Sequence, residues 1–162
     1  MHIRPETVQD AMAIHDLTRR AFEGHAHSDG SEPDIVDRLR DADALTVSLL
    51  ADVAGTIVGH VAFSPVAWDG HGQWAGLGPV SVDPDYQRRG IGDSLIREGL
   101  SRIRSSGFDG CVVLGEPGYY GRFGFVPDGR LTYPGVPPEY FTVLAFGPIL
   151  GEGEVRYHSA FA

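Results

Sequence analysis

The residues best placed to do chemistry form a short polar segment, Gln87-Arg88-Arg89-Gly90-Ile91-Gly92, between a strand-like run and a helical one. Glycine has no side chain and adopts positive φ angles without strain, so backbone N–H groups here can approach an anion closely. The first turn of a helix adds unpaired N–H donors and the positive end of the helix dipole. The two arginines add fixed positive charge. The segment is therefore predicted to bind a phosphate group.

The elements that would hold this segment can be read from hydrophobic periodicity. The run Trp74 to Val82 before it is typical of a strand. After it, apolar residues recur at helical spacing, which predicts an amphipathic helix that ends near Ser106-Gly107. A short apolar run, Cys111 to Leu114, then predicts a buried strand. Strand, helix and strand in this order form one βαβ unit.

The rest of the chain surrounds that unit with further helices and strands. Helices are expected over Thr7–Phe22, with Thr7 as N-cap and Val8 on the apolar face, and after the N-cap Ser31. Strands are expected over 2–4, 45–51, 56–68, 140–146 and 155–158. No repeat or linker interrupts the chain, so we expect one domain over residues 1–162. The fold class is α/β or α+β, with one central βαβ unit.

Charge and composition exclude several classes of protein. The formal net charge is −9, from 22 acidic and 13 basic residues, and this disfavours a nucleic-acid partner. No apolar run approaches the ~18 residues of a membrane helix, and the polar N-terminus carries no signal peptide, so a cytoplasmic protein without a membrane partner is expected. The single cysteine, Cys111, rules out a cysteine-based metal site and is expected to be buried and inert.

Histidines offer two weaker candidates for chemistry. His25 and His27, with Asp29, have a spacing that could bind a metal, but only two histidines are close together in a polar loop. A solvated loop is favoured, and no metal site is predicted. His60 lies inside an apolar strand, where a buried core histidine is commoner than a catalytic base.

The phosphate-binding segment resembles the coenzyme-A signature of the GNAT superfamily of N-acetyltransferases, Gln/Arg-x-x-Gly-x-Gly/Ala after a strand. A second segment, Tyr120-Gly121-Arg122-Phe123-Gly124-Phe125, resembles the superfamily's Tyr-x-x-x-Gly-Phe pattern. The two together are far more specific than either alone. The resemblance spans roughly residues 1 to 126, and it implies a mixed, mostly antiparallel sheet with a splayed βαβ unit flanked by helices.

The resemblance also implies an activity, transfer of an acetyl group from acetyl-CoA directly to a primary amine in a ternary complex. It assigns the pyrophosphate of acetyl-CoA to Gln87, Arg88, Arg89, Gly90, Ile91 and Gly92. The backbone of Val80, Ser81 and Val82 would pair with the pantetheine arm. Tyr120 takes the position of the general acid, which protonates the departing thiolate. Tyr119, its neighbour, is expected to point to another side of the short helix.

The general base stays open. Many family members carry an asparagine after the fifth strand, and here the tighter Gly115-Glu116-Pro117-Gly118 replaces it. This puts Glu116 near the chemistry, while Glu32 opens the second helix in the region that shapes the acceptor mouth. Glu116, Glu32 and His60 are the candidate bases, and a neutral amine would need none. His25, His27 and the segment 137–141 are placed near the acceptor by fold position only.

Two other functions remain as alternatives. A Rossmann-like dinucleotide binder is suggested by Gly90-x-Gly92 and by Glu116, some 24 residues after the last of those glycines. Against it, Leu95 stands where a third glycine is needed, and two helices precede the βαβ unit. A non-catalytic acyl-CoA-binding module of the same fold is the other alternative. The acceptor, a small-molecule or peptide amine, is not specified by the sequence, and monomer and homodimer both stay open.

Overall fold

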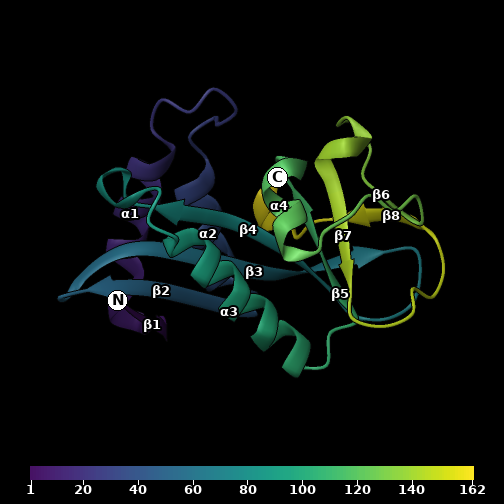
Figure 1. The fold of residues 1–162 in the computed structure, drawn as a ribbon, viewed down its shortest axis with the longest axis horizontal. Helices are drawn as coiled ribbons and strands as arrows, with labels where there is room; N and C mark the ends of the chain where they lie inside the picture. The colour runs from purple at the N-terminus through teal and green to yellow at the C-terminus, as the bar shows by residue number, and fades with distance from the viewer.

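The computed structural model describes residues 1–162, which build a mixed sheet with the neighbour order β1-β2-β3-β4-β5-β7 (Figure 1). Its strands are β1 (His2–Pro5), β2 (Val47–Val53), β3 (Thr56–Trp68), β4 (Trp74–Val82), β5 (Gly110–Leu114) and β7 (Phe141–Ala145). In this path β4 and β5 are the only parallel pair. Two short strands, β6 (Leu131–Thr132) and β8 (Gly153–Arg156), pair with each other, and β8 also pairs with the end of β3.

Helices cover both faces of the sheet. The α-helices are α1 (Ala11–Phe22), α2 (Glu32–Asp41), α3 (Ile91–Ser105) and α4 (Pro117–Tyr120). Because successive strand residues face opposite sides, Leu49 and Ala51 on β2 pack in the α3 core, whereas Leu50 packs with Ile14 and Val36 of α1 and α2. Figure 1 shows α3 in front of the sheet with α1 behind it. The helices include none with the length and apolar character that crossing a bilayer requires.

Most predicted elements are confirmed, and the expected α/β fold with one central βαβ unit is observed. The apolar stripe of α3 is buried, at Ile91, Leu95, Ile96, Leu100 and Ile103. Strands β3 and β4 have the predicted bounds. A sheet with one parallel pair in its main path excludes the doubly wound parallel sheet of a Rossmann-like dinucleotide binder.

Two local predictions are wrong, both at helix starts. The first helix begins as a 3₁₀ turn, and Val8 is 91% exposed instead of buried. There the Asp10 carboxylate accepts the Thr7 N–H at 2.7 Å, which holds the chain in a tighter turn. At the second helix the Ser31 hydroxyl donates to Asp29 rather than capping a helical N–H.

The feature that matters most for function is the separation of β4 from β5. Their pairing ends at Leu77 and Val113, after four residue pairs. Just beyond, Gly78 and Pro79 together oppose Ala62 on β3, which makes a bulge that redirects β4. From there β4 continues along β3, while β5 continues along β7. The sheet therefore opens into a V at the carboxyl ends of its two parallel strands.

Candidate active site

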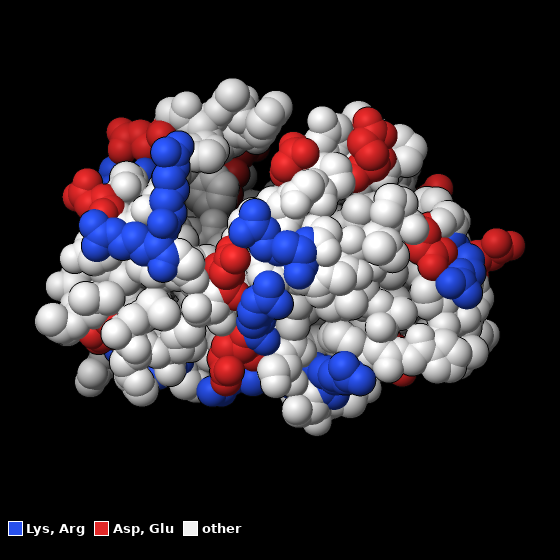
Figure 2. Space-filling view, in the orientation of Figure 1, with Lys and Arg blue, Asp and Glu red and all other residues white.

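Two cavities open at this V, and Tyr119 and Tyr120 contribute to one each. The first, which we name the apolar cavity, has a volume of about 420 Å³ and lies among Leu77–Val80, Leu114, Tyr120 and residues of α1, α2 and the C-terminal segment. The second, the loop cavity, has a volume of about 470 Å³ and lies between the Gln87–Gly92 segment and Tyr119. Figure 2 shows a notch at the top of the molecule between the α1–α2 side and the α4–β7 side.

The backbone of the Gln87–Gly92 segment has a shape that suits an anion site. Gly90 is the residue before α3 and adopts a left-handed conformation with φ of 78°. Arg88 is also left-handed, with φ of 65°, which is unusual for a residue with a side chain. At Gly92 an added Cβ would lie 3.2 Å from the Tyr119 hydroxyl, so a larger residue would crowd the cavity wall. The segment presents its backbone and the first turn of α3 to the loop cavity.

The charges around the loop cavity also suit an anion. Arg88 lines the cavity and forms no ion pair, in a chain with a large acidic excess. Arg89 also lacks a carboxylate partner, but it stacks on the ring of Tyr86, 5.0 Å away, and does not line the cavity. Gln87 donates its side-chain amide to the Val82 carbonyl at 3.3 Å, which supports the shape of the turn. Of the two arginines, Arg88 is the freer to meet a ligand.

A partly buried ion pair that sequence reasoning missed fixes the start of this segment. The Arg20 guanidinium on α1 donates to Asp83 at 2.8 Å, and the Asp83 side chain is only 10% exposed. The other Asp83 oxygen accepts the N–H of Asp85 at 2.9 Å. The Arg20 hydrogen bond holds the pKa of Asp83 below its usual value, although burial opposes this. Arg20 therefore acts as a positioning residue. Because Arg20 and Asp83 lie 63 positions apart, the sequence gave no indication that they pair.

Tyr119 and Tyr120 point to different cavities, as expected for neighbours on a short helix. The Tyr119 hydroxyl donates to Asp93 Oδ1 at 2.9 Å, and Arg122 donates to the other oxygen at 3.1 Å. This Tyr119–Asp93–Arg122 contact was also missed from the sequence. It closes the loop cavity from the α4 side.

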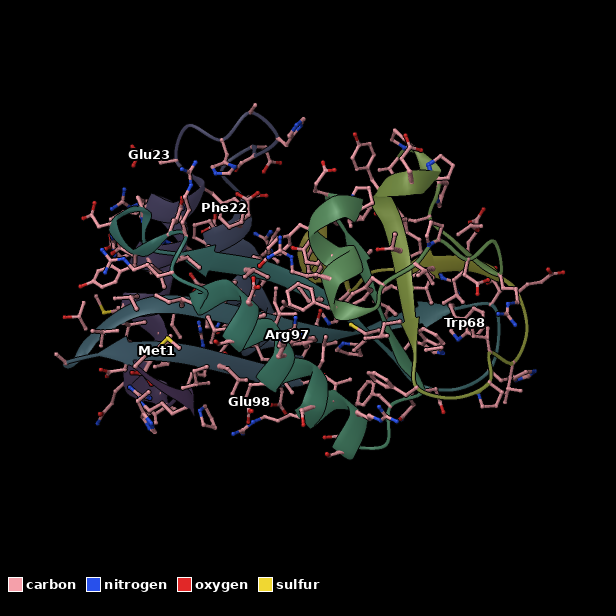
Figure 3. All side chains as sticks on the ribbon, in the orientation of Figure 1. Met1, Phe22, Glu23, Trp68, Arg97 and Glu98 are labelled. Carbon is pink, nitrogen blue, oxygen red and sulfur yellow. The ribbon has the colours of Figure 1, made fainter.

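Tyr120 lines the apolar cavity, and its hydroxyl makes no hydrogen bond within the chain. Its ring packs so closely on Gly115 that an added Cβ there would lie 2.5 Å away. It also meets the ring of Phe125 edge to face at 6.1 Å. Burial raises the pKa of Tyr120 to about 12, so the phenol is held protonated. Arg97 of α3, labelled in Figure 3, places its guanidinium over the ring of Phe123, 4.9 Å from the ring centre.

Of the three candidate bases, only Glu32 lines one of the two cavities. Glu32 lines the apolar cavity together with Tyr120, and its Oε1 accepts the Ser28 hydroxyl at 2.6 Å. Glu116 is exposed at the start of α4 and lines neither cavity. His60 is fully buried, with Nε2 2.8 Å from the Ser48 hydroxyl, and also lines neither cavity. Burial lowers the pKa of His60, which fits the expected core histidine.

The remaining predicted residues divide between the two cavities and the surface. Val80 lines the apolar cavity and Val82 the loop cavity, while Ser81 between them is buried. His25 and His27 line neither cavity.

The segment 137–141, which was placed near the acceptor by fold position, does not line the apolar cavity. Its residues Pro138 and Phe141 line a separate, smaller hollow. The residues that line the apolar cavity from the C-terminal third of the chain are Tyr133, Tyr157 and Phe161, which the sequence did not single out.

Comparison with known proteins agrees with this geometry. The model of the acetyltransferase (GNAT) family matches residues 11–125. Over an alignment 169 positions long, gaps included, the chain is 38% identical to YhbS of Escherichia coli K12, described as an uncharacterized N-acetyltransferase; the alignment covers 99% of this chain and 98% of YhbS.

Two solved structures share the whole fold. A GNAT family acetyltransferase from Brucella melitensis in complex with acetyl-CoA has a TM-score of 0.88 at 50% identity, covering 99% of this chain and 97% of that one. YhbS from Escherichia coli in complex with CoA has a TM-score of 0.87 at 35% identity, covering 99% and 91%. With a family model over most of its length and relatives matched end to end, this chain belongs to the GNAT family of acetyltransferases.

Proposed function

We propose that residues 1–162 act as one N-acetyltransferase domain that moves an acetyl group from acetyl-CoA to a primary amine. The observation that carries the proposal is the pair of cavities at the V between β4 and β5. One cavity has the backbone and charge for a pyrophosphate, and the other has room for an acceptor. The acetyl-CoA and CoA complexes of the Brucella and Escherichia relatives support the same co-substrate.

The residues present fit coenzyme A. The segment Gln87–Gly92 offers backbone N–H groups, the first turn of α3 and the unpaired Arg88 to a pyrophosphate. Past Leu77 the side of β4 that faced β5 is unpaired, so Val80–Val82 can pair with an extended chain as a strand would. We infer that this edge holds the pantetheine arm and directs the thioester toward Tyr120.

The chemistry follows from where Tyr120 lies. The lone pair of the neutral amine attacks the thioester carbonyl carbon, a C–N bond forms, and the C–S bond breaks to release a thiolate. The Tyr120 hydroxyl, which has no partner in the chain, donates a hydrogen bond to the departing sulfur. Because the pKa of Tyr120 is raised to about 12, it stabilises the thiolate mainly as a hydrogen-bond donor, and the thiolate takes its proton from water on release.

We propose Glu32 as the group that receives the proton lost by the amine. It is the only charged side chain among the residues of the apolar cavity, and Tyr120 belongs to the same cavity. Glu116 is a weaker candidate, because it is exposed and lines neither cavity. The proton would pass from Glu32 to solvent after each turnover.

Binding of acetyl-CoA tests the first half of the proposal. We expect calorimetry to detect acetyl-CoA and CoA but not NAD. Arg88→Ala should weaken binding about ten- to hundredfold, as loss of a charged hydrogen bond predicts. Arg104→Ala is the matched control, because Arg104 lies at the far end of α3 and stacks on Phe146. Binding of NAD alone, or equal affinity in both variants, would contradict the assignment of the loop cavity.

Turnover tests the second half. Release of free thiol from acetyl-CoA should depend on an added amine, and mass spectrometry should find the acetylated product. The chain contains no lysine, so acetylation of its own lysine side chains cannot mimic this signal. Tight binding of acetyl-CoA with no turnover on any amine would favour the non-catalytic acyl-CoA-binding module instead.

A further inference from the structure

The apolar cavity has an unusual balance of charge. Nine of its twelve lining residues are hydrophobic, and Glu32 is the only charged one. The chain carries 13 arginines, yet none of them reaches this cavity. The cavity therefore has one anionic group to meet a cation and no cationic group to meet a carboxylate or a phosphate.

A continuous aromatic surface forms the wall of the cavity on the C-terminal side. The ring of Tyr157 lies 5.3 Å from that of Tyr133 and 5.3 Å from that of Phe161. Phe22, at the end of α1, lies across the notch from α4 (Figure 3). Such rings bury a hydrocarbon or aromatic body well, and their faces also attract a cation.

The C-terminal segment that carries this wall is fastened to α2. The Arg38 side chain donates to the Ala160 carbonyl at 3.0 Å. Ala160 itself packs with Ile35 and Leu39 of α2, and Phe161 packs against the same cluster. Since Glu32 is the first residue of α2, the same helix holds both the carboxylate and the C-terminal part of the aromatic wall.

The Glu32 carboxylate is held by a hydrogen bond to only one of its two oxygens. The Ser28 hydroxyl donates to Oε1, and Oε2 has no hydrogen-bond partner in the chain. Glu32 also lies in the first turn of α2, where the helix dipole favours a negative charge. An ammonium group can therefore bind Oε2 without displacing any protein contact.

We propose that the acceptor is a small amine whose amino group is carried on an apolar or aromatic body, with no carboxylate or phosphate beside it. Glu32 binds the ammonium, and the rings of Tyr133, Tyr157 and Phe161 bury the body. Glu32 first takes one proton from the ammonium and passes it to solvent, which frees the lone pair. It then takes the second proton, which is released when the C–N bond forms. This inference rests on the proposed acetyl transfer. It disfavours free amino acids, whose carboxylate would enter the cavity next to the anionic Glu32 without a cationic partner.

A matched set of acceptors tests the inference. Phenethylamine, phenylalaninol and phenylalanine share a ring and an amino group, and they carry hydrogen, a neutral hydroxymethyl group and a carboxylate at the same carbon. With rates corrected to the free-base concentration, kcat/KM for the first two should exceed that for phenylalanine by on the order of a hundredfold. Phenylalanine as good a substrate as phenylalaninol would overturn the inference, as would a lysine peptide acetylated faster than every small amine.

Variants at Glu32 test whether this residue determines the preference for acceptors that carry no carboxylate. Glu32→Gln should raise KM for phenethylamine at least tenfold. It should also reduce the ratio of kcat/KM for phenethylamine to kcat/KM for phenylalanine. Calorimetry should find the affinity for acetyl-CoA unchanged. Asp34→Asn is the control, since Asp34 is exposed on the same helix turn and does not line the cavity. An unchanged acceptor preference in Glu32→Gln would overturn the assignment.

Failure of this inference is distinguishable from failure of the proposed function. If acetyl-CoA binds and anionic amines are the better substrates, acetyl transfer stands and the acceptor class is wrong. If acetyl-CoA binds and none of the apolar amines is acetylated, the acceptor class is also wrong. If acetyl-CoA does not bind at all, the proposed function itself fails.

Discussion

Replacing Tyr120 by phenylalanine removes one hydroxyl from the apolar cavity and leaves the ring packing on Gly115 and Phe125 in place. With its pKa raised to about 12, the phenol is ionised in only about one molecule in ten thousand at pH 8. An ordinary thiol has a pKa of about 8.5, so complete proton transfer from Tyr120 to a thiolate is uphill by roughly 5 kcal/mol. The hydroxyl therefore acts chiefly as a hydrogen-bond donor to the developing charge.

A hydrogen bond to a charged group contributes about 1.5–3 kcal/mol, which corresponds to about a 10- to 150-fold loss of kcat in Tyr120→Phe. The assay is thiol release under saturating acetyl-CoA and amine, together with calorimetry for acetyl-CoA affinity, which should not change. Tyr119→Phe is the contrast, because its hydroxyl is bonded to Asp93 in the loop cavity, and it should affect acetyl-CoA affinity more than kcat. Wild-type kcat in Tyr120→Phe would refute the reasoning.

Four further outcomes are expected. Arg20→Gln should weaken acetyl-CoA binding and lower the free energy of unfolding by about 1–3 kcal/mol, because Asp83 is left buried without its partner; calorimetry and urea unfolding measure both. Gly90→Ala should cost about 1 kcal/mol of stability through its positive φ, and unchanged stability would contradict this. Burial alone would raise the pKa of Glu6, but the nearby His60 and hydrogen bonds from Arg40 and Ser48 outweigh it and lower the pKa to about 2. The ionised Glu6 carboxylate therefore stabilises the folded protein fully above about pH 4.5, and this stabilisation is lost as the pH falls toward 2. The melting temperature of Glu6→Gln should fall less with acid than that of the wild type. Cys111, fully buried, should react with a thiol reagent only on unfolding.

The parts of the site that could be predicted are those set by local sequence. A strand, a glycine-containing turn and an amphipathic helix follow one another within about 30 residues, so Gln87–Gly92 could be placed at a helix start from periodicity alone. That Tyr119 and Tyr120 line different cavities follows in the same way from helix geometry, which turns successive side chains by about 100°. Each of these depends on neighbours along the chain rather than on tertiary contacts.

The parts that could not be predicted depend on contacts between distant segments. Arg20 and Asp83 are 63 positions apart, and neither belongs to a recognisable pattern. The aromatic wall of Tyr133, Tyr157 and Phe161 lies beyond residue 125, where the family model ends. The sequence therefore indicates the co-substrate more clearly than the acceptor, because the proposed acceptor cavity is assembled by folding from segments with no shared pattern.

The bulge at Gly78–Pro79 has a consequence for solubility and association. By ending the β4–β5 pairing early, it leaves an open sheet edge inside the molecule, along Val80–Val82. Open edges usually invite pairing with other chains and aggregation. This one lies at the base of a V, between the turn that precedes α3 and the α4 segment, and both elements flank it. The edge is therefore less open to a strand of another folded protein than an edge at the rim of a sheet, whereas the thin, flexible arm of the proposed co-substrate is narrow enough to pair with it.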